Sequence, residues 1–218
     1  RLVKDTETLI VVNCAGRTRS IIGAQSLINA GITNPIRALR NGTMGWHLAG
    51  FQLEKGATRR TPIGNIKTIH KVNERSFKIA KVFGIKFINY ADLKRWKRES
   101  LDCSLYLLDV RTSEEYALGH LPGSINAPGG QLIQNTDFYL GTLGARLVLI
   151  DDNGVRATMT ASWLLQMGWE DTVVLNDDRE PKHLETGAYN ARIPGWDNIV
   201  AEPISPWDLN LALVKGEA

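Results

Sequence analysis

The segment LIVVNCAGRTRS, residues 9–20, decides the fold of this chain and points to its chemistry. Its apolar opening, residues 9–12, predicts a short buried strand. A cysteine, a glycine and two arginines follow at once. A helical pattern of apolar residues then begins after Ser20, and Gly31 stands where a helix C-cap is expected. A strand, a tight loop and a helix in this order indicate an α/β protein with a parallel sheet.

Cys14 is the candidate catalytic residue because of where this loop places it. The backbone N–H groups of a tight loop and of a first helical turn converge and favour negative charge. A thiol there, beside Arg17 and Arg19, is expected to have a lowered pKa and to be largely thiolate, the nucleophilic form. The alternative is a buried packing cysteine. Arginine head groups need water or an anion, however, and gain nothing beside a buried thiol.

The next residues predict only half of an α/β unit. A second short strand is expected at residues 35–39, a turn at 41–42 and a short closing helix at 45–50. A lone half would leave sheet edges and apolar faces open. Because the chain starts at Arg1 without Met and without an opening unit, we expect it to be a piece of a longer polypeptide. Another chain segment or an oligomeric partner would then complete the first module.

A second and more complete α/β pattern follows. Residues 54–75 lack sustained periodicity and predict a linker. Beyond them, strands are expected at 87–88, 105–110, 124–127, 147–150 and 172–175, and helices at 91–97, 111–116 and 158–167. This succession predicts a whole α/β unit within residues 76–185.

The chain contains an internal repeat. Residues 9–39 and 147–175 share the order strand, glycine-containing loop, helix, glycine and strand. Gly16 aligns with Gly154 without a gap, which places Asp152 opposite Cys14. The chain therefore holds two such loops and only one candidate nucleophile.

Composition excludes several classes of protein. The net charge of +3 is small, and no Lys/Arg block is interleaved with aromatic residues, so we expect no nucleic-acid partner. No apolar run approaches the ~20 residues of a membrane span, so we expect no membrane partner. Two cysteines in 218 residues fit a reducing compartment, and we expect a cytoplasmic location. The histidines lack metal-ligand spacing and no nucleotide-binding loop is present, so we expect neither metal nor cofactor.

Three motifs together resemble the rhodanese family of sulfurtransferases. The first is LDVRTSEEY at residues 108–116, followed by GHLPGSI at 119–125. The second is CAGRTR at 14–19, and the third is the Gly-Trp and Ala-Gly pattern within 45–50. Together they cover most of residues 9–52 and 85–180. The resemblance implies α/β rhodanese-like modules, each with a central parallel sheet and helices on both faces.

The resemblance also implies an organisation in tandem modules. Residues 1–53 would form the C-terminal half of one module and carry its active-site loop. Residues 76–185 would form a complete module without a catalytic cysteine. Residues 186–218 would hold a linker and the start of a further module, because residues 204–209 are similar to the opening of such a module.

The reaction that the resemblance implies is transfer of sulfane sulfur in two half-steps. The Cys14 thiolate would attack a small anionic donor such as thiosulfate and become a persulfide, and a thiol or cyanide acceptor would then remove the sulfur. The loop N–H groups would hold the anionic sulfur, and the two arginines would bind the donor or brace the loop. The candidate substrate-binding residues are Ala15, Gly16, Arg17, Thr18 and Arg19.

Two other functions stay open at this point. A cysteine phosphatase uses a similar anion cradle, but such enzymes resemble Cys-x5-Arg, whereas Arg19 gives Cys-x4-Arg and the next residue is Ser20. The shorter loop favours a smaller target, sulfur. A non-catalytic interaction or regulatory protein is the second alternative. It gains support from the second module, where Asp152 cannot carry a persulfide and Ala157 stands in the place of Arg19.

Overall fold

The computed structural model describes residues 3, 5–58, 66–99, 103–176, 184–191 and 202–217. The first part of the chain forms the expected half unit, with β1 (Ile10–Val12), α1 (Thr18–Asn29), β2 (Ile36–Ala38) and α2 (Gly42–Leu48). The two strands are parallel neighbours in a two-stranded sheet. Gly31 follows the end of α1 with φ +71°, which confirms the predicted C-cap glycine.

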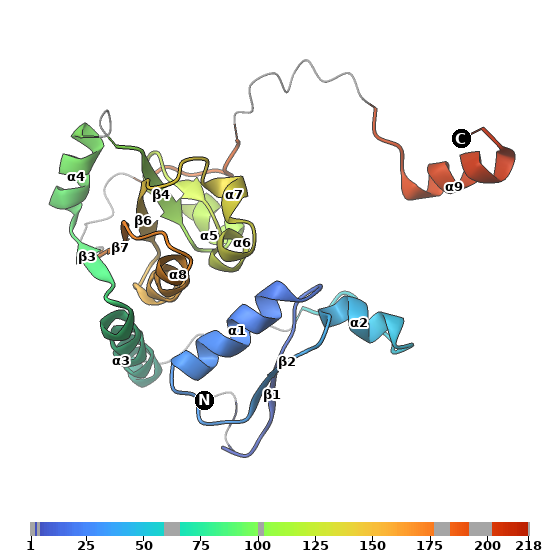
Figure 1. The fold of residues 1–218 in the computed structure, drawn as a ribbon, viewed down its shortest axis with the longest axis horizontal. Coiled ribbons are helices and arrows are strands. Elements are labelled where there is room, and N and C mark those ends of the chain that lie inside the picture. The colour runs from blue at the N-terminus through green and yellow to red at the C-terminus, as the bar shows by residue number, and fades with distance from the viewer. Residues whose placement is uncertain are drawn as a thin grey trace.

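The second part is built on a five-stranded parallel sheet, shown in Figure 1. Its strands are β3 (Lys86–Ile88), β4 (Leu105–Asp109), β5 (Ile125–Asn126), β6 (Arg146–Ile150) and β7 (Thr172–Leu175). They lie in the order β3-β7-β6-β4-β5, and every neighbouring pair is parallel. The predicted fold class, a central parallel sheet within an α/β module, is confirmed.

Helices cover both faces of this sheet. They are α3 (Ile66–Phe83), α4 (Tyr90–Arg98), α5 (Ser113–Leu118), α6 (Gly129–Gln134), α7 (Thr136–Tyr139) and α8 (Val155–Gln166). Successive strand residues point to opposite faces. Leu147 and Leu149 of β6 therefore pack with α3, α6 and α8 on one face. Val148 and Ile150 pack with Leu93 of α4 on the other.

Two of these helices begin with capping boxes. The Asn89 side chain accepts from the backbone N–H of Asp92 at 2.9 Å, and the Asp92 carboxylate accepts from the Asn89 N–H at 3.3 Å. Thr112 and Glu115 form the same reciprocal pair at the start of α5. Each box satisfies two helix N–H groups that would otherwise lack an acceptor. The boxes fix the residues at which α4 and α5 begin.

The structure corrects the sequence prediction in three places. Residues 66–75 of the predicted linker belong to α3. Its described side chains at 69–74 are exposed, and its buried side chains Ile79 and Ala80 lie near its end, so residues 69–74 give no core signal. Helix α8 begins at Val155 rather than at 158. Helices α6 and α7 are too short for a periodic pattern and were not predicted. Residues 59–65, 177–183 and 192–201 of the predicted segments lie outside the described residues.

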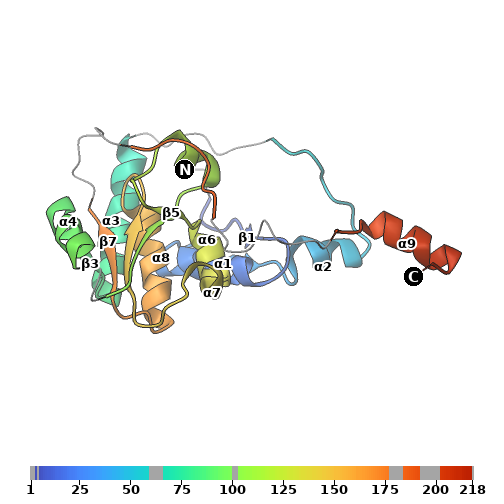
Figure 2. The same cartoon turned by 90° about the horizontal axis from the view of Figure 1, so that it is seen from above.

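Helix α1 of the first part packs against the second part, as Figures 1 and 2 show. Trp163 of α8 donates a hydrogen bond from Nε1 to Oγ of Ser26 at 2.9 Å. Ile22 and Ala30 of α1 lie against the core that α3, α6 and α8 form with the sheet. Helix α1, which directly follows the Cys14 loop in the chain, thus contacts the second module.

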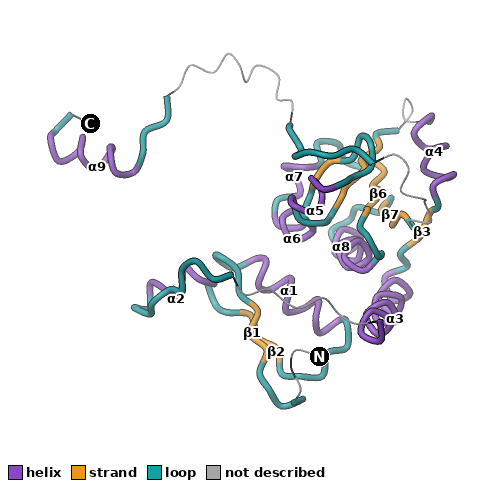
Figure 3. The backbone as a smooth tube through the Cα atoms, turned by 180° about the vertical axis from the view of Figure 1, so that it is seen from behind, coloured by secondary structure: helices purple, strands orange, loops and turns teal. Residues whose placement is uncertain are grey.

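Near the C-terminus, α9 (Pro206–Lys215) follows a Ser205 cap, and Figure 3 shows it away from the sheet. Among the helices that the structure describes, none has the length and apolarity needed to cross a membrane.

The central strand β6 should dominate the stability of the second module. Leu149 is fully buried, so Leu149→Ala is expected to lower the free energy of unfolding by about 3 kcal/mol through lost burial and a cavity. Urea denaturation followed by circular dichroism measures the loss. Leu143→Ala is the matched control, because Leu143 is 89% exposed and its loss should change stability by less than about 0.5 kcal/mol. Equal effects of the two substitutions would contradict this placement of the core.

Candidate active site

Cys14 lies just beyond the carboxyl end of β1, where the chain turns into α1. Its side chain is partly buried, and its sulfur accepts a hydrogen bond from the Ser20 hydroxyl at 3.0 Å. Ser20 itself is almost completely buried in the first turn of α1. The carboxyl ends of parallel strands are where α/β proteins usually bind ligands. The predicted nucleophile is therefore in a position suited to attack on a bound molecule.

The surroundings of Cys14 lower the pKa of its thiol below the ordinary value. The main cause is the hydrogen bond from the Ser20 hydroxyl, which stabilises the thiolate. Burial acts in the opposite direction, and hydrogen bonds from the backbone N–H groups of Gly16 and Ser20 and the positive charge of Arg19 add to the lowering. A lowered pKa increases the fraction of the nucleophilic thiolate at neutral pH.

Helix α2 holds the Cys14 loop in place. The Cys14 carbonyl accepts from the Thr43 N–H at 2.8 Å, and the Ala15 carbonyl accepts from the Met44 N–H at 3.0 Å. Gly42 makes this approach possible, since its φ is +56° and a Cβ atom there would collide with the carbonyl oxygens of Cys14 and Gly16. The sequence marked residues 41–42 only as a turn, so this support was missed.

The structure places the five predicted substrate-binding residues differently. Ala15, Arg17 and Thr18 are exposed, and Gly16 has open space where a Cβ would stand. Arg17 is the N-cap residue of α1, without a capping hydrogen bond from its side chain. Arg19 is partly buried, and its Nε has no hydrogen-bond partner among the described residues. Gly16 and Arg19 act on the thiol directly, through an N–H group and a charge. Substrate binding by all five stays a prediction.

The equivalent loop of the second module is filled by its own carboxylate. Asp151 is buried and accepts from the backbone N–H groups of Gly154 at 2.5 Å, Arg156 at 2.8 Å and Ala157 at 3.1 Å. Burial raises the pKa of Asp151, and these three N–H groups oppose that rise. In the first module the corresponding Asn13 instead donates from its side chain to Thr43. The Cys14 loop is thus open where the second loop is occupied.

A further difference lies at the position of Ser20. Its counterpart in the repeat is Thr158, whose hydroxyl is buried and has no hydrogen-bond partner among the described residues. In the first module the Ser20 hydroxyl donates to the Cys14 sulfur, whereas the equivalent Thr158 hydroxyl has no such acceptor among the described residues. This agrees with the aligned register, which puts Asp152 in the place of Cys14.

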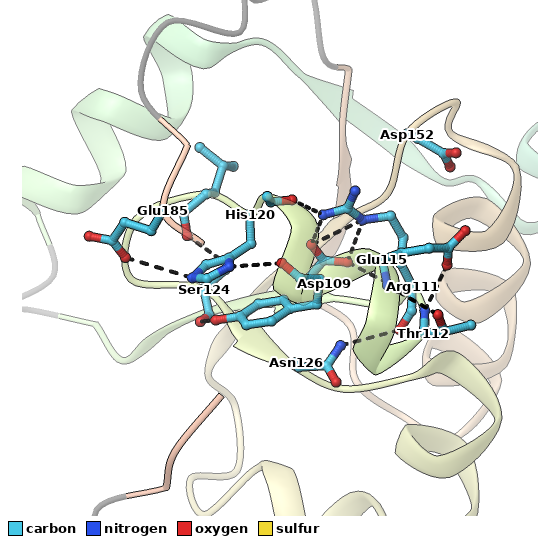
Figure 4. Close-up of polar contacts among 12 residues, drawn as sticks. Asp109, Arg111, Thr112, Glu115, His120, Ser124, Asn126, Asp152 and Glu185 are labelled. Carbon is cyan, nitrogen blue, oxygen red and sulfur yellow. Dashed lines mark hydrogen bonds and ion pairs between the residues drawn. The ribbon is translucent and has the colours of Figure 1, made fainter. Parts of the chain in front are cut away.

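Asp152 points away from the filled loop and joins a network of charged side chains. Arg156 contacts Asp152 at 3.0 Å and Glu115 at 2.6 Å. The hydrogen bond from Arg156, against some desolvation, lowers the pKa of Glu115 to about 2. Figure 4 shows Glu115 and Asp152 in the neighbourhood of Arg111. Arg156 thus pairs with one acidic side chain of the loop, Asp152, and with Glu115 of α5.

The motif residues of the second module brace this region. Arg111 donates to both oxygens of Asp109, at 2.6 Å for the closest pair, and to the Gly119 carbonyl at 2.7 Å (Figure 4). His120 is buried, stacks on Tyr116 with centroids 3.7 Å apart, and bonds the Tyr116 carbonyl through Nδ1. Within the described residues, no group of three or more His, Cys, Asp or Glu side chains could hold a metal ion.

The fold and the loop define a parallel α/β module with a cysteine at the carboxyl end of a strand, and comparisons with known proteins give its family. Residues 91–180 match the Rhodanese-like domain. The chain is 30% identical over 132 residues to "Putative thiosulfate sulfurtransferase SseB" of Mycobacterium tuberculosis, covering 59% of this chain and 43% of that protein. It is 51% identical to the thiosulfate sulfurtransferase of Pseudomonas aeruginosa, whose crystal structure superposes with a TM-score of 0.81 over 98% of this chain and 40% of that one.

Residues 91–180 of this chain thus form a rhodanese-like domain, and the chain as a whole is similar to thiosulfate sulfurtransferases. It spans about two fifths of the length of the two relatives it matches.

The hydrogen bond from Ser20 should control the acidity of Cys14. Ser20→Ala removes the donor that stabilises the thiolate, so the pKa of Cys14 is expected to rise. The pH dependence of the rate of alkylation by iodoacetamide, followed by mass spectrometry of the Cys14 peptide, measures the shift. Ser26→Ala is the control on the same helix and should leave the profile unchanged. An unshifted profile in Ser20→Ala would show that another group holds the thiolate.

The filled loop should resist conversion into a sulfur carrier. In a Cys14→Ser background, Asp152→Cys restores a thiol at the aligned position, but Asp151 still occupies the N–H groups of the loop. We expect thiosulfate to add no sulfur to residue 152, as measured by mass spectrometry of the intact protein and its peptides. A stable persulfide at that position would contradict the role given to Asp151.

Proposed function

We propose that Cys14 transfers sulfane sulfur from an anionic donor, such as thiosulfate, to a thiophilic acceptor. One observation carries the proposal: the Cys14 sulfur faces an N–H and hydroxyl cradle that lowers its pKa, whereas the second cradle is filled by Asp151. The match of residues 91–180 to the Rhodanese-like domain and the named activities of the two relatives support it.

In the first half-reaction the Cys14 thiolate attacks the outer sulfur of thiosulfate. A bond forms between Cys14 Sγ and that sulfur, and the sulfur–sulfur bond of the donor breaks. Sulfite leaves with the electron pair of the broken bond, and Cys14 becomes a persulfide. The N–H groups of Gly16 and Ser20 and the charge of Arg19, which stabilise the thiolate, would also hold the negative persulfide.

In the second half-reaction a nucleophilic acceptor attacks the outer sulfur of the persulfide. With cyanide, a carbon–sulfur bond forms and thiocyanate leaves. The electron pair of the broken sulfur–sulfur bond returns to Cys14 as thiolate, so the enzyme is regenerated without a redox cofactor. Two substrates that react in turn at one residue are expected to give ping-pong kinetics.

We propose that the second module is a non-catalytic partner of the first, and that residues 186–218 lead into a further module. The sequence I-S-P-W-D-L at 204–209 matches I-N-Y-A-D-L at 88–93, where α4 begins in the second module. Ser205 caps α9 as Asn89 caps α4. Leu93 is buried under the sheet, however, while Leu209 is 41% exposed. An apolar helix start of this kind is expected to pack on strands of its own module.

The alternatives receive less support. The loop has Cys-x4-Arg spacing, one residue shorter than the Cys-x5-Arg spacing of cysteine phosphatases, and a shorter loop favours a target smaller than phosphate. A purely regulatory protein has no need for a thiol whose pKa is lowered. We also propose a cytoplasmic location, because Cys14 and Cys103 are both free and a reducing compartment keeps such thiols active.

Loss of the thiol should abolish the activity. Wild-type protein treated with thiosulfate is expected to gain the mass of one sulfur atom on Cys14, and cyanide should release it as thiocyanate. Cys14→Ser should lower the rate of thiocyanate formation by at least about 10³-fold, because no other described residue serves as nucleophile. Cys103→Ser is the matched control and should keep full activity.

Full activity in Cys14→Ser would overturn the assignment. Hydrolysis of an aryl phosphate without sulfur transfer would favour the phosphatase.

A further inference from the structure

Asn13 and Asp151 stand at the same position of the two loops, but their side chains have different partners. The ungapped register that aligns Gly16 with Gly154 also aligns Asn13 with Asp151. Asp151 accepts hydrogen bonds from the backbone N–H groups three, five and six residues after it. Asn13 is exposed and donates from Nδ2 to the Thr43 hydroxyl at 3.2 Å. One backbone position therefore fills the second loop and leaves the first loop open.

A side chain placed like that of Asp151 would compete with the sulfur in the first loop. The three N–H groups that Asp151 binds correspond to those of Gly16, Thr18 and Arg19. The Gly16 N–H donates to the Cys14 sulfur and contributes to lowering its pKa. An acceptor that entered from position 13 would take this N–H away from the thiolate.

Thr43 holds the residues that open the first loop through both of its polar groups. Its hydroxyl accepts from Asn13 and donates to the Cys14 carbonyl at 3.2 Å, and its backbone N–H donates to the same carbonyl at 2.8 Å. A hydroxyl has one proton and two lone pairs, so it can make both side-chain bonds at once. Thr43 is the second residue of α2, the helix whose start lies against this loop. It thus joins the Asn13 side chain to the backbone of the nucleophile.

An amide at position 13 suits this arrangement, and a carboxylate does not. The Asn13 amide supplies a donor to the Thr43 hydroxyl, whose own proton is then left for the Cys14 carbonyl. An ionised carboxylate only accepts, so it would compete with that carbonyl for the hydroxyl proton. Backbone N–H groups are strong donors to a carboxylate, and Asp151 shows the conformation in which this loop type provides three of them.

We propose that Asn13 and Thr43 are positioning residues that keep the N–H groups of the first loop available to the Cys14 sulfur. The pair acts through the backbone of the loop rather than on the sulfur itself. The inference rests on the proposed sulfur transfer at Cys14. It assigns the choice between a reactive and a filled loop to the residue that precedes the nucleophile, so that aspartate at this position would give a filled, inactive loop.

Asn13→Asp tests the pair by giving the first loop the chemistry of the second. The new carboxylate should take the Gly16 N–H, so alkylation of Cys14 by uncharged iodoacetamide should shift to higher pH and thiocyanate formation from thiosulfate and cyanide should slow about tenfold. Amide hydrogen exchange of the loop peptide, measured by mass spectrometry, should also slow about tenfold. Asn29→Asp is the matched control, since it makes the same change near the end of α1, where Asn29 accepts from Gln25, and it should alter none of the three measurements.

Thr43→Val removes the hydroxyl and nearly preserves the size of the side chain. Without its anchor the Asn13 side chain is expected to enter the loop part of the time, so the alkylation profile should shift to higher pH and thiocyanate formation should slow about fivefold. Thr43→Ser keeps the hydroxyl and should restore both the profile and the rate to within about twofold of the wild type.

Three outcomes would overturn the proposal. Slower turnover of Asn13→Asp with unchanged hydrogen exchange would show that the added charge acts without filling the loop. Equal losses in Thr43→Val and Thr43→Ser would show that the hydroxyl is not needed. Unshifted alkylation profiles in Asn13→Asp and Thr43→Val would show that the sulfur keeps its N–H groups without the pair.

Alkylation and hydrogen exchange do not depend on sulfur transfer, so they separate this inference from the proposed function. If both change as expected in the variants while wild-type Cys14 takes up no sulfur from thiosulfate, the positioning role is supported and sulfur transfer is overturned.

Discussion

The backbone N–H groups at the start of a helix that follows a buried strand need an acceptor, and this constraint shapes both loops of the chain. In the second module Asp151 supplies the acceptor from within the loop, through three hydrogen bonds. In the first module the Cys14 sulfur receives N–H groups from Gly16 and Ser20, together with the Ser20 hydroxyl. A carboxylate fixed in place satisfies the loop permanently, whereas a thiolate remains free to react.

This difference explains why one fold serves two purposes in the same chain. In the second loop Asp151 satisfies the backbone N–H groups, and Arg156 pairs with Asp152 and Glu115. These contacts stabilise the loop. The first loop keeps open space above Gly16 and an unpaired Arg19 Nε within the described residues. Open anion sites of this kind cost stability, and proteins commonly accept that cost where function needs it. The second module packs on α1, which follows this loop, through Trp163 and the adjoining core.

Much of the fold follows from local patterns in the sequence. The strands β4 and β6 are continuous apolar runs, and such runs mark strands that are covered on both faces. The caps at Asn89 and Thr112 were predictable because a capping box uses residues three apart. Helix α3 was not predictable, since its described side chains at 69–74 are exposed, and α6 and α7 are shorter than two helical turns. Their positions depend on tertiary packing, which a local pattern does not contain.

Some residues of the candidate site could likewise be predicted from the sequence, and others could not. Cys14 and its neighbouring arginines stand out in the sequence because their types and spacing carry the chemistry. Gly42 and the α2 start do not, since the need for glycine arises only where residues nearly thirty positions apart meet. The filling of the second loop also escapes the alignment, which directs attention to Asp152 opposite Cys14, while Asp151 makes the decisive contacts. Asp151 occupies the loop N–H groups, whereas its neighbour Asp152 pairs with Arg156 outside them. In the first loop the Asn13 side chain donates to Thr43 instead, and the N–H groups of Gly16 and Ser20 are left to the Cys14 sulfur.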